Sequence, residues 1–142
     1  MKYKTRQNGF HTSLLLMALL LSGCGDTPEV RQSQEVRQVL QQIKDRTLLG
    51  QQACIDLIKS ISRNPATTEV PELYNIANHT GVTFRNTYIA IFEWTGINMV
   101  QAQNGFGAKI GVEATCEYNI NVGQLYGLVF DGQVFIRNGV YQ

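Results

Sequence analysis

The apolar residues of this chain follow two different periods, and the change between them most constrains the fold. Between residues 36 and 61, apolar side chains recur at the spacings typical of one face of an α-helix. From Val82 onward they recur at every second position, which is typical of strands with one buried face. A helical segment followed by consecutive strands predicts an α+β fold with the helix packed across an antiparallel sheet.

The helical stripe consists of Val36, Val39, Leu40, Ile43, Cys54, Leu57, Ile58 and Ile61. The offset from Ile43 to Cys54 is nearly three whole turns, so both halves of the stripe share one face, which Thr47 and Gly50 continue. We expect one long helix, continuous or kinked. The alternative is two consecutive helices broken near Gly50, because a glycine inside a helix costs about 1 kcal/mol. The end of the helical region is set by Pro65, since the residue before a proline avoids helical geometry.

A meander of four to five antiparallel strands is expected after the helical region, at residues 82–94, 99–103, 110–120, 125–130 and 133–137. The segment 110–120 shows the strictest alternation of apolar and polar side chains. Asp131-Gly132 is a favoured two-residue turn, so the last two segments form a hairpin.

The apolar residues of the strands fall into two sets, and we expect the two sets to lie on different faces of the sheet. The first set is expected to face the helix and fill the core, although it suits a ligand groove as well: Phe84, Tyr88, Phe92 and Trp94. The second set is expected to form an exposed patch if the far face of the sheet is uncovered: Ile89, Ile91, Tyr126 and Leu128.

The first residues have the composition of an export signal. Basic residues at positions 2, 4 and 6 precede an apolar run at residues 14–21. That run is too short to span a bilayer, which takes about 20 residues.

The run ends in Leu21-Ser22-Gly23-Cys24, which resembles the lipobox of bacterial lipoproteins. The resemblance implies cleavage before Cys24, a diacylglycerol on its sulfur and acylation of the new amino end. In that family an aspartate directly after the cysteine retains the protein at the inner membrane. Gly25 occupies that position, so the resemblance implies an outer-membrane anchor facing the periplasm.

These features predict a signal peptide at residues 1–23, a lipidated cysteine with a short tether at residues 24–33, and one α+β domain at residues 34–142. The tether is short because Thr27 and Pro28 have the residue types of a helix N-cap and first helical position.

With Cys24 lipidated, Cys54 and Cys116 remain. The periplasm is oxidising, and an even pair of cysteines there is expected to form a disulfide. Cys54 belongs to the helical stripe and Cys116 to the apolar face of segment 110–120, so both point at the same core. The alternative is two buried free thiols.

The mature segment also carries Asn64-Pro65-Ala66-Thr67 after the helix, and Gln103-Asn104-Gly105-Phe106-Gly107-Ala108-Lys109 before Cys116. Both stretches loosely resemble small exported bacterial proteins in which an Asn-x-Phe-Gly turn precedes a strand with a cysteine. The resemblance implies export and fold, but no activity. In such a tight turn Phe106 is expected either in the core or exposed at the tip.

No catalytic residue, metal ligand or cofactor site is predicted. After the signal the only histidine is His79, in a predicted polar turn without a nucleophile motif. Glu113 and Glu117 are a possible carboxylate pair, but they are expected to be the soluble side of a strand. The formal charge of +1 and the absence of a basic cluster argue against nucleic-acid binding.

We therefore expect a membrane-anchored, non-enzymatic interaction module of the cell envelope, held by lipid on Cys24 and binding an envelope protein. The alternative is a carrier or sensor of a small apolar ligand between helix and sheet, where Thr47 and Gly50 leave a notch.

Overall fold

The computed structural model describes residues 28–142, and the predicted signal peptide, lipobox and Cys24 lie outside these residues. The chain divides into two compact units at residue 35. The unit Val36–Gln142 contains every strand found in residues 28–142, and the described residues before it are the first turns of helix α1 (Pro28–Ile61). The fold is α+β, as the change of period predicts.

Helix α1 is continuous, so the prediction of one long helix is confirmed and the alternative of two helices broken near Gly50 is wrong. Gly50 is accommodated because the ring of Tyr118 lies against it: a Cβ at Gly50 would lie 2.5 Å from Tyr118 Cδ1. The buried Thr47 hydroxyl donates to the Ile43 carbonyl over 2.7 Å. The helix ends where Ser62 N–H donates to the Ile58 carbonyl.

Replacing Gly50 with alanine is expected to destabilise the protein, although alanine is the better helix former. The gain in helix propensity is about 1 kcal/mol. Overpacking against the buried Tyr118 ring, whose body cannot swing aside like a flexible chain end, costs about 1–3 kcal/mol. Urea unfolding should show a lower midpoint for Gly50→Ala. A higher midpoint would show that the ring yields, and Gly50→Ala with Tyr118→Leu should recover stability.

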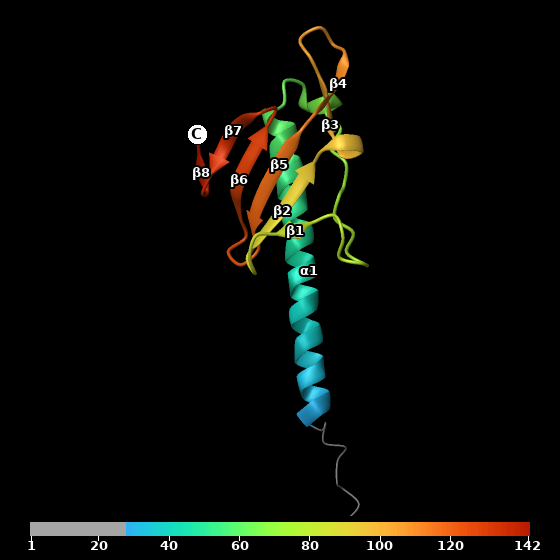
Figure 1. Ribbon diagram of the computed structural model, residues 1–142, viewed down its shortest axis with the longest axis vertical. Helices are drawn as coiled ribbons and strands as arrows, with labels where there is room; N and C mark the ends of the chain where they lie inside the picture. The colour runs from blue at the N-terminus through green and yellow to red at the C-terminus, as the bar shows by residue number, and fades with distance from the viewer. Residues whose placement is uncertain (1–27) are drawn as a thin grey trace, which may run out of the picture. The chain divides into compact units, whose positions relative to one another are not determined.

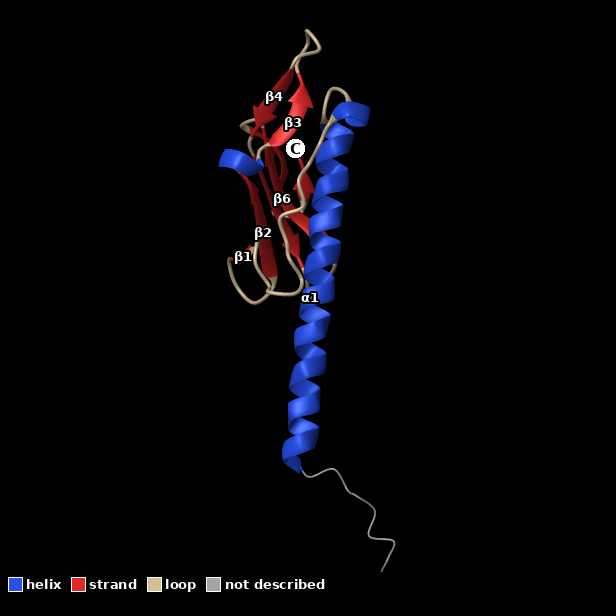
Figure 2. Ribbon diagram, turned by 90° about the vertical axis from the view of Figure 1, so that its right-hand side faces the viewer, coloured by secondary structure: helices blue, strands red, loops and turns tan. Residues whose placement is uncertain are grey.

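The strands form two sheets: β1 (Thr83–Phe84), β2 (Ile89–Trp94), β3 (Val100–Gln103), β4 (Lys109–Val112), β5 (Ala114–Asn119), β6 (Gln124–Phe130), β7 (Gln133–Arg137) and β8 (Val140–Tyr141). The larger sheet is antiparallel with the order β1-β2-β5-β6-β7-β8, and β3 pairs with β4 in a separate two-stranded sheet. In the views of Figures 1 and 2, the C-terminal part of α1 covers one face of the larger sheet, and the β3–β4 hairpin extends past the ends of β6 and β7.

The expected count of four to five strands is wrong because two predicted strands are each divided and a further short strand, β8, pairs with β7. Residues 82–94 form the hairpin β1–β2, with Asn86 Oδ1 accepting the N–H groups of Tyr88 and Ile89. Residues 110–120 change neighbours at Glu113: β4 pairs with β3, whereas β5 lies between β2 and β6. The alternation of apolar and polar side chains continues through Glu113, because the backbone stays extended while its neighbouring strands change.

The two apolar sets on the strands are distributed differently from the prediction. Phe92 and Trp94 are fully buried, but Phe84 and Tyr88 are 37% and 54% exposed, since they lie at or beyond the turn of the β1–β2 hairpin. The predicted outer patch does not form, because Ile89 and Leu128 are buried. Register shifts on both sides of β6 change which of its side chains face the helix.

Candidate functional site

Cys54 and Cys116 are bonded to each other, and their Cα atoms lie 6.0 Å apart. Both side chains are fully buried, one on α1 and the other on β5. The predicted disulfide is therefore confirmed, and the alternative of two free thiols is wrong. The bond joins the helix to an interior strand of the larger sheet.

His79 belongs to a small aromatic cluster. Its Nδ1 lies 2.6 Å from the Tyr74 hydroxyl oxygen, and its ring lies 5.8 Å from that of Phe84 between centroids. Its backbone has a φ of +57° in the turn before β1. No serine or cysteine side chain is hydrogen bonded to this imidazole among the described residues, so the contacts are those of a turn held by packing.

Burial, with a further contribution from the charge of Asp45, raises the pKa of Tyr74 above its ordinary value of 10.0. The folded protein therefore keeps this proton at a pH where the unfolded chain loses it, and stability falls as pH rises from 10.0 through the folded pKa. Urea unfolding at pH 7 to 11 should show a smaller loss of stability in Tyr74→Phe than in the wild type. Equal losses would contradict this assignment, and Tyr141→Phe, at an exposed position, is the matched control.

Glu113 and Glu117 do not form a paired site. The Glu117 carboxylate is ion paired with Arg85 of the β1–β2 turn, and its chain lies over Gly127, where a Cβ would be 3.0 Å from Glu117 Oε2. Glu113 is exposed at the junction of β4 and β5. Within residues 31–142 no group of three or more histidine, cysteine and acidic side chains is placed to hold a metal ion.

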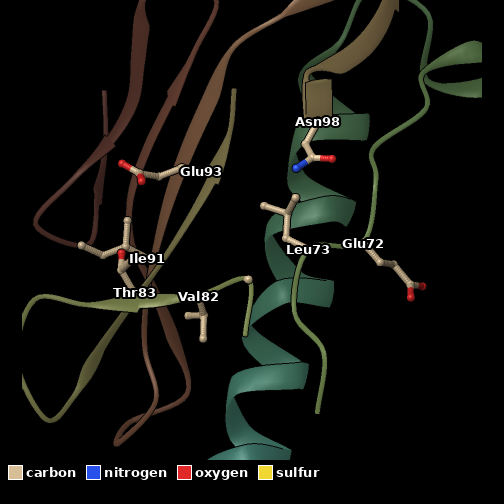
Figure 3. Close-up of a pocket in the computed structure, with 8 residues that line it drawn as sticks. Glu72, Leu73, Val82, Thr83, Ile91, Glu93 and Asn98 are labelled. Atoms are coloured by element: carbon tan, nitrogen blue, oxygen red, sulfur yellow. The ribbon is translucent and has the colours of Figure 1, made fainter. Parts of the chain in front are cut away.

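A hollow of 420 Å³ lies between the loop before β1 and strand β2. Two of its lining residues are acidic, Glu72 on the loop and Glu93 on β2. Figure 3 shows their carboxylates pointing away from each other, with Leu73 between them. Acid–base chemistry needs groups that converge on one reacting atom, so this hollow does not present a catalytic pair.

The notch at Thr47 and Gly50 is filled by the Tyr118 ring. The space that motivated the ligand-carrier alternative is therefore occupied at this point. An open, mainly apolar groove of 230 Å³ lies further along the helix, between Val39 and Ile43 of α1 and Tyr88 before β2. Arg46 closes one side of it by donating to the Ile120 carbonyl over 3.2 Å.

A groove of 390 Å³ lies at the end of the unit that carries the β3–β4 hairpin. Its lining comes from the end of α1, from β3 and β4, and from the turn between β6 and β7. The apolar lining residues are Ile61, Ala102, Ile110, Val112, Phe130 and Phe135. Charged lining residues are Arg63 and Asp131. Polar side chains line the groove in equal number, so it offers both apolar contacts and hydrogen-bonding groups to an occupant: Ser62, Arg63, Gln103, Asn104, Asp131 and Gln133.

The tip of the β3–β4 hairpin displays Phe106, whose side chain is 98% exposed. Asn104 Oδ1 accepts the N–H groups of Phe106 and Ala108 over 2.9 and 3.0 Å, and the Asn104 N–H donates to the Ala108 carbonyl. Gly107 supplies the turn with a φ of +82°. Of the two positions expected for Phe106, the core and the tip of the turn, it occupies the tip. The loop around it is held by its own hydrogen bonds.

The groove and Phe106 are continuous, because Asn104 and Gly105 of the tip also line the groove. We call this groove with Phe106 the hairpin-end surface. Sequence reasoning identified the turn but missed the groove, since its walls come from segments far apart in the chain. The glycine-flanked phenylalanine was the one signal that could have indicated it.

None of the helices in residues 28–142 has both the length and the hydropathy needed to cross a bilayer. The sequence matches no known protein family and no characterised protein, and the fold matches no solved structure.

Proposed function

We propose that this protein is a bacterial envelope lipoprotein, anchored through Cys24, that acts as a non-catalytic docking module and binds a protein partner with its hairpin-end surface. The observation that carries the docking proposal is the 98% exposed Phe106 on a hydrogen-bonded tip. Water contact over a whole phenyl ring is unfavourable, and a partner that covers the ring gains that free energy.

The rigidity of the tip supports binding rather than mere exposure. Asn104 holds both sides of the turn, so little conformational entropy is lost when Phe106 enters a partner's pocket. Aromatic side chains on such positions are the residue class that dominates protein interfaces. The neighbouring groove supplies further apolar area, because Ile110 is 42% exposed beside it.

The placement of this surface agrees with an anchor at Cys24. Within the unit Val36–Gln142, the β3–β4 hairpin lies at the end opposite the segment of α1 that begins the unit (Figures 1 and 2). A lipid on Cys24 lies close to the start of α1 in sequence, at Pro28. A chain anchored at Cys24 enters this unit at Val36, away from the hairpin, which supports an accessible hairpin-end surface.

Photocrosslinking in intact cells of the source bacterium tests the docking proposal. A photoreactive phenylalanine analogue at position 106 should capture one dominant envelope protein, and the same analogue at Leu49, on an exposed part of α1, should not. Position 113, beside the groove, is a second capture site. Equal capture from positions 106 and 49, or none from 106 and 113, would contradict docking by the hairpin-end surface.

The anchor is tested separately. Cys24→Ser should move the protein from the membrane fraction to the soluble periplasmic fraction, with its Cys54–Cys116 bond intact. If Cys24→Ser stays with the membrane to the same extent as the wild type, the lipid anchor is wrong, whatever the crosslinking shows.

A further inference from the structure

The outer edge of β4 is the longest strand edge without a backbone partner in the described part of the chain. The larger sheet ends on β1 and β8, which contain two residues each, and such short edges resist pairing with other chains. Strand β4 has four residues and pairs only with β3. The other edge of β4 is therefore longer than the edges of the larger sheet and lacks the protection that a short strand gives.

The pairing of β3 determines which groups of β4 are free. Gln101 exchanges both backbone hydrogen bonds with Glu69, over 2.8 and 2.9 Å, on the side of β3 away from β4. Because bonding alternates in antiparallel pairs, Gln101 and its partner Gly111 form a non-bonded pair. The N–H and C=O groups of Gly111 therefore point away from β3, as do those of Lys109 two residues earlier.

The same alternation continues to Glu113, whose carbonyl accepts the N–H of Asp131 over 3.1 Å. Strand β6 thus follows this edge until Asp131 and then turns back into β7. Beyond that point the outward backbone N–H and C=O groups of Lys109 and Gly111 have no backbone partner in the part of the chain that the structure describes. Strand β6 covers this edge of the chain along β5, and the edge continues uncovered along β4.

The 390 Å³ groove lies at this uncovered edge. Ile110 and Val112 project from β4 into its lining, and Phe130 and Phe135 line it from β6 and β7. An added strand would place every second side chain over these residues. A helix in the same groove could not use the free groups of Gly111, because its own backbone groups are already bonded.

The charges around the groove are also unpaired. Arg63 lies against Gly105 at the tip end, where a Cβ would clash with its Nη1. Asp131 and Glu113 lie at the other end, joined through their backbones. Neither Arg63 nor Asp131 has a side-chain hydrogen bond or ion pair within the described residues.

We propose that an extended peptide segment of a partner protein adds to the free edge of β4 as a strand, with alternate apolar side chains in the groove, an acidic residue near Arg63 and a basic residue near Asp131. This mode of binding takes affinity from main-chain hydrogen bonds and specificity from alternate side chains. It rests on the proposed docking function and specifies the chemical class of the partner segment.

A random twelve-residue peptide library on phage, selected against the oxidised protein, tests strand addition. Enriched peptides should carry apolar residues at every second position. Synthetic copies should lose at least tenfold in affinity when alternate backbone nitrogens are N-methylated, because each methyl group removes the hydrogen of a main-chain donor. N-methylation at the intervening positions should change affinity much less.

The matched protein variants are Gly111→Pro, which removes the outward N–H, and Gly111→Ala, which keeps it. Gly111 does not have a positive φ, and a Cβ there would lie 3.1 Å from Met99 Sδ, in a flexible side chain, and 3.7 Å from Gln101 Nε2. Peptide affinity should fall at least tenfold in Gly111→Pro and stay within about twofold in Gly111→Ala. Should Gly111→Pro fail to fold, amide hydrogen exchange of the wild type replaces it: Gly111 should exchange fast alone and become protected with peptide, whereas Ile110 is protected throughout.

Strand addition is overturned if no peptide is enriched, if enriched peptides show helical spacing, or if peptide binding leaves the Gly111 amide unprotected. These outcomes are separable from failure of the docking function. Capture by position 106 in cells without any dependence on Gly111 leaves docking intact and removes strand addition. If peptides bind at Gly111 but positions 106 and 113 capture no protein in cells, strand addition is supported and the docking function is contradicted.

Discussion

Replacing Cys54 and Cys116 together with alanine is expected to lower the free energy of unfolding by about 4 kcal/mol. The bond closes a loop with a sequence separation of 62, and the chain-entropy account assigns this loss to the unfolded state, which becomes free to expand. A domain of this size has a total stability of about 5–15 kcal/mol, so the variant would retain little of it. Urea unfolding followed by fluorescence of Trp94, the only tryptophan, measures the change.

Wild-type protein reduced with dithiothreitol is the control, because it loses the crosslink and keeps both sulfur atoms. The double alanine variant also loses packing at two fully buried positions, so it should be less stable than the reduced wild type. An unfolding midpoint that reduction leaves unchanged would show that the crosslink does not stabilise the fold.

Replacing Trp94 with alanine is expected to cost about 3–5 kcal/mol. The indole is fully buried beside Phe92, and its Nε1–H donates to the Pro71 carbonyl over 2.8 Å. The substitution therefore opens a cavity and leaves a carbonyl without its donor. Far-ultraviolet circular dichroism in urea is the measurement, since the variant has no tryptophan to report by fluorescence.

Trp94→Phe separates the two parts of this effect. Phenylalanine keeps most of the ring volume but cannot donate to Pro71, so the expected cost is about 1–3 kcal/mol. The loop around Pro71 is also held by Gln51, whose Oε1 accepts the Leu73 and Tyr74 N–H groups. If Trp94→Phe is as damaging as Trp94→Ala, the hydrogen bond rather than the packed volume controls this position.

The parts of the fold that depend on local period were predictable from sequence. The stripe from Ile43 to Cys54 is in phase, and the helix that contains it is continuous. The disulfide was predictable because Cys54 and Cys116 each lie on the apolar face of their own element. Each inference needed only the residues within a few turns or pleats.

The parts of the fold that depend on which strands pair, and in what register, were not predictable from sequence. Alternation runs through Glu113 without a break, although the chain there passes from one sheet to another. The faces of β6 were predicted incorrectly because register shifts next to Tyr118 and Val129 depend on neighbouring strands. The groove at the hairpin end was missed for the same reason, since its walls meet only after β6 turns away from β4.

The bond between α1 and β5 also determines how the protein responds to tension. A pulling force applied to the two ends of the chain passes from residue 54 to residue 116 through the sulfur atoms. Residues 55 to 115, which include the whole β3–β4 hairpin, carry no load while the bond is intact. Reduction turns this shielded region into extensible chain, so the redox state of one bond sets the mechanical length of the molecule.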